Sequence, residues 1–407
     1  MHGLAPVALE GLDDLNLLDL RLHATSDLGP VWRRLRDEAP VWWHPSRGGL
    51  PGFWVVTRYE DVVAVSKDNR HYTVARGNML GTLLRGGDTA GGKMIAVSDG
   101  PWHAALRRLL ISGFGPRALG VVAQTIETAT RRVVTAALER GTCDFAREVA
   151  AQIPLTAICE LLGVPEEDRA SVLELTNAAM LTGGEDEPDI ETRVARSRIL
   201  GYYSRLAAER RDAPGGDLVS LLATSEVDGR PLTKEETLLN CYNLIVGGDE
   251  TARLAMSGGV LALIDHPEQW KRLLADPAAV DPAVEEILRW TSPASHVGRT
   301  ATAATELRGT RIEEGDIVTL WTPAANRDER AFDEPDTFDL ARSPNRHVTF
   351  GHGAHFCIGA HLARTELRTL LHTLRTHATS IALTGPPRRI ESNFITGISS
   401  LPVALSG

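Results

Sequence analysis

Most of this chain alternates apolar and charged positions at the helical period, and strand-like stretches are short. The helical period runs through positions 118–180, and a further amphipathic helix is expected over 189–212. The longest helical run covers 233–264, where Thr233 and Glu236 form a plausible capping box at its start. The pattern therefore predicts a mainly α fold with a small β portion.

Shorter segments complete this picture. A β-rich run at 53–57 predicts a strand, and the residues around Glu314-Gly315-Asp316 predict a hairpin over 306–320. Helices are expected over 59–67 and 281–290, and a last long helix over 358–375.

Several stretches without periodicity lie between these elements. The glycine-dense segment 78–92 predicts a long mobile loop, which is often functional in a compact domain. A helix should follow from about Pro101, with Asp99 as its cap. The acidic residues at 182–188 predict a surface connection, and residues 326–349 look irregular. No composition shift marks a linker, so we expect residues 1–407 to form one domain.

Composition narrows the possible functions. The 407 residues carry a formal net charge of −10, which argues against a nucleic-acid partner. The first twenty residues have no basic region and no long apolar run, so neither a signal peptide nor a membrane anchor is expected. Four widely spaced cysteines form no CxxC pair, which fits a reducing cytoplasm better than a disulfide framework or a zinc site.

One of these cysteines has an unusual setting. Cys357 lies in FGHGAHFCIG, residues 350–359, directly before the last predicted helix. Backbone N–H groups at a helix start lower the pKa of a thiol, and the glycines let the backbone approach a flat ligand closely and donate to sulfur. Phe350 is placed to keep water from the sulfur. A thiolate in this setting is typical of an axial ligand to haem iron. The alternative, an inert buried thiol, suits Cys143, Cys159 and Cys241 better.

Residues 350–364 resemble the haem-binding loop of the cytochrome P-450 superfamily, and of its soluble bacterial type in particular. The resemblance covers about residues 28–403. It implies the fold of that superfamily, a helix-rich prism in which haem b lies between the long central helix and the cysteine loop. It also implies that Cys357 is the iron ligand and that Phe350 and Gly359 belong to the cofactor site.

The longest predicted helix contains a second motif. Gly247 and Gly248 each cost about 1 kcal/mol relative to alanine in a helix interior, so they need a reason. Close packing against a neighbouring helix is one reason. The resemblance implies another, that they leave space above the cofactor for dioxygen and substrate. It also implies that Glu250 and Thr251 are the acid–alcohol pair that delivers protons for dioxygen activation. Asp249, at a variable position of the motif, receives no role.

Two further sets of polar residues are matched by the resemblance. Glu286 and Arg289 resemble the ExxR element, which has a folding role, with Arg342 or Arg346 completing its network. The side chains expected to bind the haem propionates are His103, Arg107, Arg299 and His355. His103 and Arg107 lie one helical turn apart and point the same way. The alternative for each of the four is an ordinary surface salt bridge.

The implied activity is monooxygenation, most often hydroxylation, of a small organic molecule in bacterial secondary metabolism. The chain has no flavin or iron–sulfur segment, so electrons should come from a ferredoxin and its reductase. Arginines such as Arg108, Arg346, Arg364 and Arg368 could form the docking patch, and an ordinary solvated charged face is an equally good explanation of them. The protein is expected to be a cytoplasmic monomer that contacts neither nucleic acid nor membrane. Substrate, either free or bound to a carrier protein, should contact residues 74–97, 175–190, 292–297 and 394–398.

Two alternatives stay open at this point. The same haem could serve a peroxygenase, or an oxidative coupling or desaturating enzyme, although Glu250 and Thr251 favour dioxygen over peroxide. A non-catalytic haem sensor or carrier-protein binder is the other class, and the presence of the same pair argues against it.

Overall fold

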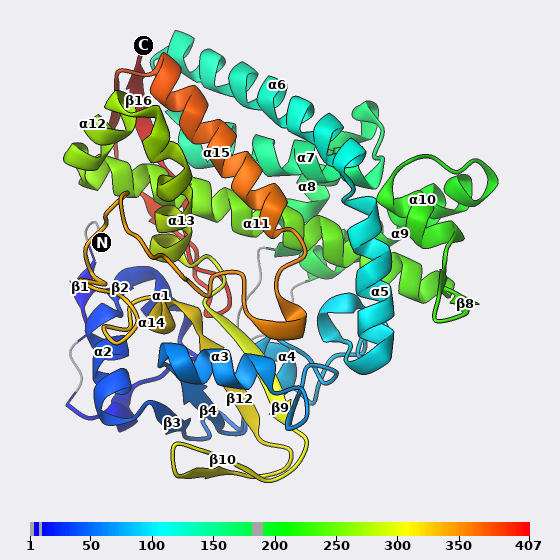
Figure 1. The fold of residues 1–407 in the computed structure, drawn as a ribbon, viewed down its shortest axis with the longest axis vertical. Helices are drawn as coiled ribbons and strands as arrows, with labels where there is room; N and C mark the ends of the chain where they lie inside the picture. The colour runs from blue at the N-terminus through cyan, green and yellow to red at the C-terminus, as the bar shows by residue number, and fades with distance from the viewer. Residues whose placement is uncertain (1–3, 8–9, 181–189) are drawn as a thin grey trace.

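The computed structural model describes residues 4–7, 10–180 and 190–407. The long helix α11 (Lys234–Asp265) crosses the centre of the molecule (Figure 1). The helices α6 (Pro116–Arg140), α7 (Gln152–Leu162) and α15 (Ala360–His377) lie on one side of it, and a five-stranded sheet lies on the other (Figure 1). The expected class, mainly α with a small β portion, is confirmed.

The other helices have these bounds: α1 (Leu20–Thr25), α2 (Gly29–Glu38), α3 (Tyr59–Lys67), α4 (Leu80–Leu84), α5 (Gly100–Gly113), α8 (Glu166–Met180), α9 (Ile190–Asp212), α10 (Leu218–Thr224), α12 (Pro267–Ala275), α13 (Val280–Thr291) and α14 (Thr322–Ala325). Short 3-10 turns cover Leu12–Asp14, Ile95–Val97, Pro277–Ala279 and Gly353–His355, and a π-helical turn covers Phe145–Ala150. No single helix of the described residues is long and apolar enough to cross a bilayer; α5 with Ala118–Arg140 reaches that length only as a pair bent by 61°.

The five-stranded sheet has the order β3-β4-β12-β9-β5, where β12 runs parallel to β4 and antiparallel to β9. Its strands are β3 (Val41–His44), β4 (Phe53–Val56), β5 (Tyr72–Thr73), β9 (His296–Ala301) and β12 (Ile317–Trp321). A second sheet has the order β13-β16-β6, from β6 (Thr142–Asp144), β13 (Ser380–Leu383) and β16 (Pro402–Ser406). Two-stranded pairs are formed by β1 (Ala5–Pro6) with β2 (Ser26–Asp27), β7 (Glu226–Val227) with β8 (Arg230–Pro231), β10 (Thr305–Leu307) with β11 (Thr310–Ile312), and β14 (Arg388–Arg389) with β15 (Ile398–Ser400).

The capping box at the start of α11 is confirmed. The Thr233 hydroxyl accepts a hydrogen bond from the Glu236 backbone N–H at 3.2 Å, and the Glu236 carboxylate accepts one from the Thr233 N–H at 2.8 Å. These bonds satisfy two backbone donors that would otherwise have no partner, and they fix where the central helix begins.

The hairpin expected over 306–320 is wrong in its pairing. β10 pairs with β11 around a turn at Arg308 and Gly309, whose φ values are +54° and +75°. β12 instead enters the five-stranded sheet between β4 and β9. All five residues of β12 are buried, as in a strand covered on both faces, so its apolar side chains favour the centre of the larger sheet.

Two other expectations need correction. The segment 78–92 is not a structureless loop, because it contains α4, whose Leu80, Leu83 and Leu84 are buried. Asp99 precedes α5 as expected, but its carboxylate makes no capping bond. That carboxylate accepts hydrogen bonds from Val74 and Ala75 instead, at the start of the segment before α4. The expected connection at 182–188 lies outside the described residues.

Candidate active site

A cavity of about 320 Å³ lies between α11 and the loop that carries Cys357. It is lined by Ser66, Val74, Asn78, Ala96, Gly247, Gly248, Thr251, Ala252, Ala255, Leu288, Pro293, Ala294, Val297, Arg299, Thr349, Phe350, Gly351, His352, His355, Cys357, Gly359, Leu362, Ala363, Glu366 and Leu367. Its mostly apolar wall with a few convergent polar groups is typical of a small-molecule or cofactor site.

Tight backbone turns hold Cys357 at this cavity. The Cys357 N–H donates to the Phe350 carbonyl at 2.8 Å, which folds the loop back on itself. Gly353 has a φ of +71°, and a Cβ atom there would lie 2.5 Å from the Ser66 carbonyl oxygen of α3. A side chain at position 353 would therefore clash with α3. We infer that this glycine serves the seating of the loop on α3 rather than the approach to a ligand.

The pKa of the Cys357 thiol differs from the expectation that the helix start lowers it. The Cys357 side chain is exposed toward the cavity, but the protein around it removes it from bulk water and so raises the pKa of its thiol. A hydrogen bond from the Gly359 backbone and the charges of Arg107 and Arg364 act in the opposite direction. The helix start alone therefore does not produce a thiolate. A bound metal cation would, because coordination removes the thiol proton outright.

The two glycines of α11 have different surroundings. A Cβ atom on Gly247 would meet nothing within 4 Å, whereas one on Gly248 would lie 3.0 Å from the Ile158 side chain of α7. Gly247 therefore leaves open space beside the cavity, and Gly248 permits the close packing of α7 on α11. Close packing against a neighbouring helix therefore accounts for Gly248, and the space left by Gly247 is compatible with the second explanation. The helix continues through them from Lys234 to Asp265.

The acid and the alcohol that follow are neighbours in sequence, but only the alcohol lines the cavity. Thr251 Oγ1 lies 3.4 Å from the Gly247 carbonyl oxygen, to which it donates. The Glu250 carboxylate is 2% exposed and forms an ion pair with Arg253, one turn further along α11. Its second oxygen, Oε2, has no hydrogen-bond partner among the described residues.

Of the four side chains expected to bind the propionates, Arg299 and His355 line the cavity, whereas His103 and Arg107 do not. The ring centroids of His103 and His355 are 4.3 Å apart, and Arg107 donates to the Phe356 carbonyl at 2.6 Å. Burial, followed by the charges of His355 and Arg107, lowers the pKa of His103 to about 4. His355 Nε2 lies 3.1 Å from a carboxylate oxygen of Asp99.

The surroundings of Arg299 indicate whether the cavity can bind an anionic group. It is 5% exposed and donates only to the carbonyl of its own neighbour, Gly298, at 2.8 Å. No ion pair of Arg299 is found within the described residues. Burial lowers its pKa to about 10, and the charge of Asp99 acts in the opposite direction. A buried guanidinium without a carboxylate partner is unfavourable unless an anion binds it. The residues present therefore fit a cofactor that carries carboxylates.

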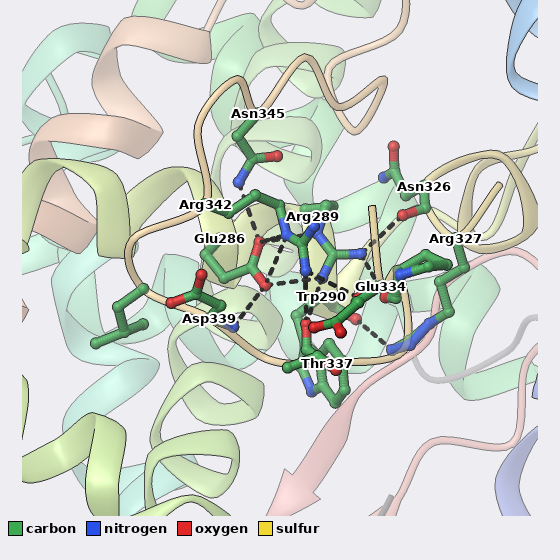
Figure 2. A network of polar contacts seen from close by, with 12 residues as sticks. Glu286, Arg289, Trp290, Asn326, Arg327, Glu334, Thr337, Asp339, Arg342 and Asn345 are labelled. Carbon is green, nitrogen blue, oxygen red and sulfur yellow. Dashed lines mark hydrogen bonds and ion pairs between the residues drawn. The ribbon is translucent and has the colours of Figure 1, made fainter. Parts of the chain in front are cut away.

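Glu286 and Arg289 belong to a buried network of ion pairs and hydrogen bonds (Figure 2). Glu286 and Arg289 are both fully buried and 2.7 Å apart, and Arg342 joins them at 3.2 Å. Arg289 also donates to the carbonyls of Asn326, Pro335 and Thr337. Of the two arginines expected to complete the network, Arg342 does so. Arg346 instead offers its backbone carbonyl to the Tyr59 hydroxyl.

Two of the four arginines expected in the docking patch form ion pairs within the protein. Arg364 binds Glu285 through two hydrogen bonds and stacks on Phe350 at 4.6 Å. Arg368 pairs with Asp281 at 2.5 Å. Both arginines therefore connect α15 to α13, although Arg368 is still 44% exposed. Arg108 and Arg346 are exposed.

Two of the four expected substrate segments line the cavity. Val74, Asn78 and Ala96 come from the first, and Pro293, Ala294 and Val297 come from the third. Residues 175–180 and 394–398 do not line it in the described part of the chain, and residues 181–189 lie outside that part. Residues 394–398 lie next to residues 292–297, because the Ser295 N–H donates to the Phe394 carbonyl at 2.8 Å. His296 points away into the protein, between Leu80 and Asn393.

Sequence reasoning missed two residues. Asp99 joins the cysteine loop, through His355, to the segment that begins at Val74. Glu366 lines the cavity from α15 although its side chain is fully buried. One feature of the sequence could have identified Glu366. It follows Leu362 at helical spacing, on what is otherwise the apolar face of its helix.

Known proteins match nearly the whole chain. The cytochrome P450 family profile matches residues 205–399. Cytochrome P450 NovI of Streptomyces niveus is 46% identical over 396 residues, which are 97% of each chain. The steroid C26-monooxygenase of Rhodococcus jostii is 38% identical over 91% of this chain and 80% of its own. The crystal structure of P450 OxyD, which is involved in the biosynthesis of vancomycin-type antibiotics, superposes with a TM-score of 0.88 at 38% identity, over 97% of this chain and all of that one. This chain therefore belongs to the cytochrome P450 family, as a monooxygenase whose cofactor is haem b.

Proposed function

We propose that this monooxygenase hydroxylates a C–H bond of a small organic molecule in bacterial secondary metabolism. The observation that carries the proposal is the cavity, which has the Cys357 thiol and the Thr251 hydroxyl in its wall among largely apolar residues. The relation to OxyD, a P450 of antibiotic biosynthesis, supports the metabolic setting. The similarity to NovI over 97% of both chains agrees with a bacterial P450 of this kind.

Cys357 is proposed as the ligand of the haem iron, with Phe350, Gly248 and Gly359 around the same site. When bound, a thiolate-ligated haem supplies dioxygen activation and the oxidation of a C–H bond. Arg299, His103 and Arg107 would hold the propionates through charge-assisted hydrogen bonds. His355 would contribute through its ring nitrogen that does not face Asp99.

Glu250 and Thr251 are proposed as the catalytic acid–alcohol pair. Thr251 holds a proton at Oγ1, on the cavity wall, and Glu250 lies directly behind it on α11. Glu250 is buried and paired with Arg253, so it would act once that ion pair opens, by accepting a proton from water and passing it toward Thr251.

The proposed electron donor is a ferredoxin with its reductase, which would approach the exposed Arg108 beside the cysteine loop. Substrate would enter as a free molecule or bound to a carrier protein, between the segment of α4 and residues 293–297. The protein is proposed to act as a cytoplasmic monomer.

A labelling experiment tests this function. A compound selected by its shift of the haem spin state is incubated with ferredoxin, reductase and isotopically labelled dioxygen. The proposal expects one labelled oxygen atom in the product. Thr251→Ala should lower the product formed per electron, whereas Thr251→Ser, which keeps the hydroxyl, should not. Product without labelled oxygen, or an unchanged yield per electron in Thr251→Ala, would contradict the proposed chemistry.

A further inference from the structure

A second cavity, of about 120 Å³, lies among α2, α11, α13 and the pair β14-β15. It has no lining residue in common with the cavity that contains Cys357. Residues 396–398, which are expected from the sequence to contact substrate, line this second cavity and not the first. Ser295 also lines the second cavity, whereas its neighbour Ala294 lines the first. The two cavities are therefore separate but adjoin the same segment, residues 293–297.

The wall of the second cavity is largely aromatic and aliphatic. Trp32 and Trp321 are 4% and 0% exposed, and their ring centroids lie 5.0 Å apart. Leu28 and Leu254 are buried in the same wall. Apolar cavities of about 150 Å³ bind benzene, and the volume here, about 120 Å³, is of the same order. The cavity therefore has room for one small flat ring in contact with indole rings.

Arg327 brings a buried positive charge to this wall. It is 8% exposed, and its guanidinium carbon lies 4.1 Å from the centroid of the Trp290 ring (Figure 2). Its Nη2 donates to the Trp290 carbonyl at 3.3 Å, and no ion pair of Arg327 is found among the described residues. A guanidinium has five N–H donors, so most of those of Arg327 have no protein acceptor in the described part of the chain.

The charged residues of the wall leave an excess of one positive charge. Two arginines, Arg327 and Arg389, and one carboxylate, Asp265, line the cavity. Arg389 is half-buried, and within the described ranges no ion pair of it is found either. His23 lines the cavity as well, but burial lowers the pKa of its ring from the usual value, so the ring is neutral near pH 7. The wall therefore suits a ligand with a single negative charge.

The adjoining surface groove does not neutralise Arg327. This groove shares Gly29, Trp290 and Arg327 with the second cavity. Each of its four acidic residues is engaged elsewhere: Asp27 accepts from the Gly29 N–H, Asp37 pairs with Arg330, Glu38 pairs with Arg34, and Asp336 pairs with Arg33. A buried guanidinium without a compensating charge is unfavourable, so an anion from outside the protein would be bound there.

We propose that the second cavity is a further ligand site, which binds a small aromatic carboxylate with one negative charge. The ring would lie against Trp32 and Trp321, where it buries apolar surface and stacks on indole. The carboxylate would accept paired hydrogen bonds from Arg327, because the planar guanidinium matches the two oxygens of a carboxylate. This site is separate from the one proposed for haem and for the oxidised substrate.

Fluorine NMR of the holoenzyme locates such a ligand. The protein is labelled with 5-fluorotryptophan, held as the diamagnetic carbon monoxide complex of the reduced haem, and titrated with sodium benzoate. Three of the eight tryptophans, Trp32, Trp290 and Trp321, line the second cavity, and none lines the first. We expect the resonances of these three, assigned from single substitutions by phenylalanine, to shift saturably. The absorption spectrum of the same sample reports the haem site separately.

Charge variants test the role of the arginine. Arg327→Gln should raise the Kd for benzoate about ten- to a hundredfold, because a charge-assisted hydrogen bond is lost. Neutral benzamide should bind the unmodified protein more weakly than benzoate by a similar factor. Arg311→Gln, at a side chain that is 75% exposed on β11, is the matched control and should bind benzoate as the unmodified protein does.

If Arg327→Gln does not fold, Arg389→Gln and the comparison of benzoate with benzamide make the same test. The absence of saturable shifts in the three resonances at millimolar benzoate would overturn the inference. Equal Kd values for benzoate and benzamide would overturn it as well, and so would an unchanged Kd for benzoate in a folded Arg327→Gln protein.

Discussion

Glu286→Gln should destabilise the protein far more than the same change at the residue before it. The Glu286 carboxylate accepts from Arg289 Nε and Nη2 at 2.8 and 2.7 Å, and from Arg342 Nε at 3.2 Å. The backbone N–H of Asp339 and the amide of Asn345 also donate to it, at 3.0 and 3.1 Å (Figure 2). Glutamine keeps the shape but removes the charge and turns one acceptor into a donor.

The size of the effect follows from burial. Two arginine hydrogen bonds to a charged group contribute about 1.5–3 kcal/mol each. Removal of one partner from a buried ion pair costs about 3–5 kcal/mol, because the other charge is left without compensation. Arg289 is fully buried, so it cannot turn to water. We therefore expect the free energy of unfolding to fall by about 3–5 kcal/mol.

Glu285→Gln is the matched control. Glu285 also binds an arginine through two hydrogen bonds and lies 3.2 Å from His347 Nε2, but its side chain and that of Arg364 remain 29% and 28% exposed. A loss of about 1 kcal/mol is expected there. Denaturant unfolding followed by circular dichroism, with haem saturating in all samples, measures both variants. Equal losses in the two would refute the argument that burial decides the strength of this network.

Three further predictions follow from the site and its surroundings. Arg299→Gln should weaken haem retention about ten- to a hundredfold, because a charge-assisted hydrogen bond to the cofactor is lost. A haem-transfer assay measures the retention, and Arg108→Gln should behave there as the unmodified protein does. Equal retention in Arg299→Gln would remove Arg299 from the cofactor site. Burial lowers the pKa of His296 from 6.5 to about 4, so on acidification the unfolded chain is protonated at this ring before the folded protein is. His296 should therefore lower the free energy of unfolding by about 3 kcal/mol between pH 6.5 and 4. His296→Gln should show a shallower fall in the same acid titration, and an identical slope would contradict the neutral ring. Gly248→Val should destabilise the protein by about 1–3 kcal/mol through overpacking against α7, measured by thermal unfolding, whereas Gly247→Ala should cost less.

The sequence predicted those elements whose signals are local. The Thr233–Glu236 capping box fixed the start of α11, and the glycine-rich run around Cys357 identified the loop that meets it across the cavity. These features depend on residues within a few positions of one another. For that reason they can be recognised before the chain is folded.

What could not be predicted depends on contacts between distant segments. No residue near Ile317–Trp321 indicates that this strand pairs with β4 and β9. Its pairing partners depend on which sheet buries it on both faces. Asp99 precedes a helix as a capping residue would, but the backbone from Val74 and the ring of His355 compete successfully for its carboxylate. Likewise, Glu366 lines the cavity beside Thr251 because α15 packs on α11.

The central claim is that Cys357 supplies the iron ligand. The most direct measurement is the absorption spectrum of the reduced protein with carbon monoxide, compared between Cys357→Ala and Cys143→Ala, the latter at a half-buried cysteine on β6. The account predicts that the band of thiolate-bound haem is present in the unmodified protein and in Cys143→Ala, and is lost in Cys357→Ala. A Cys357→Ala protein that kept both its haem and that band would contradict it.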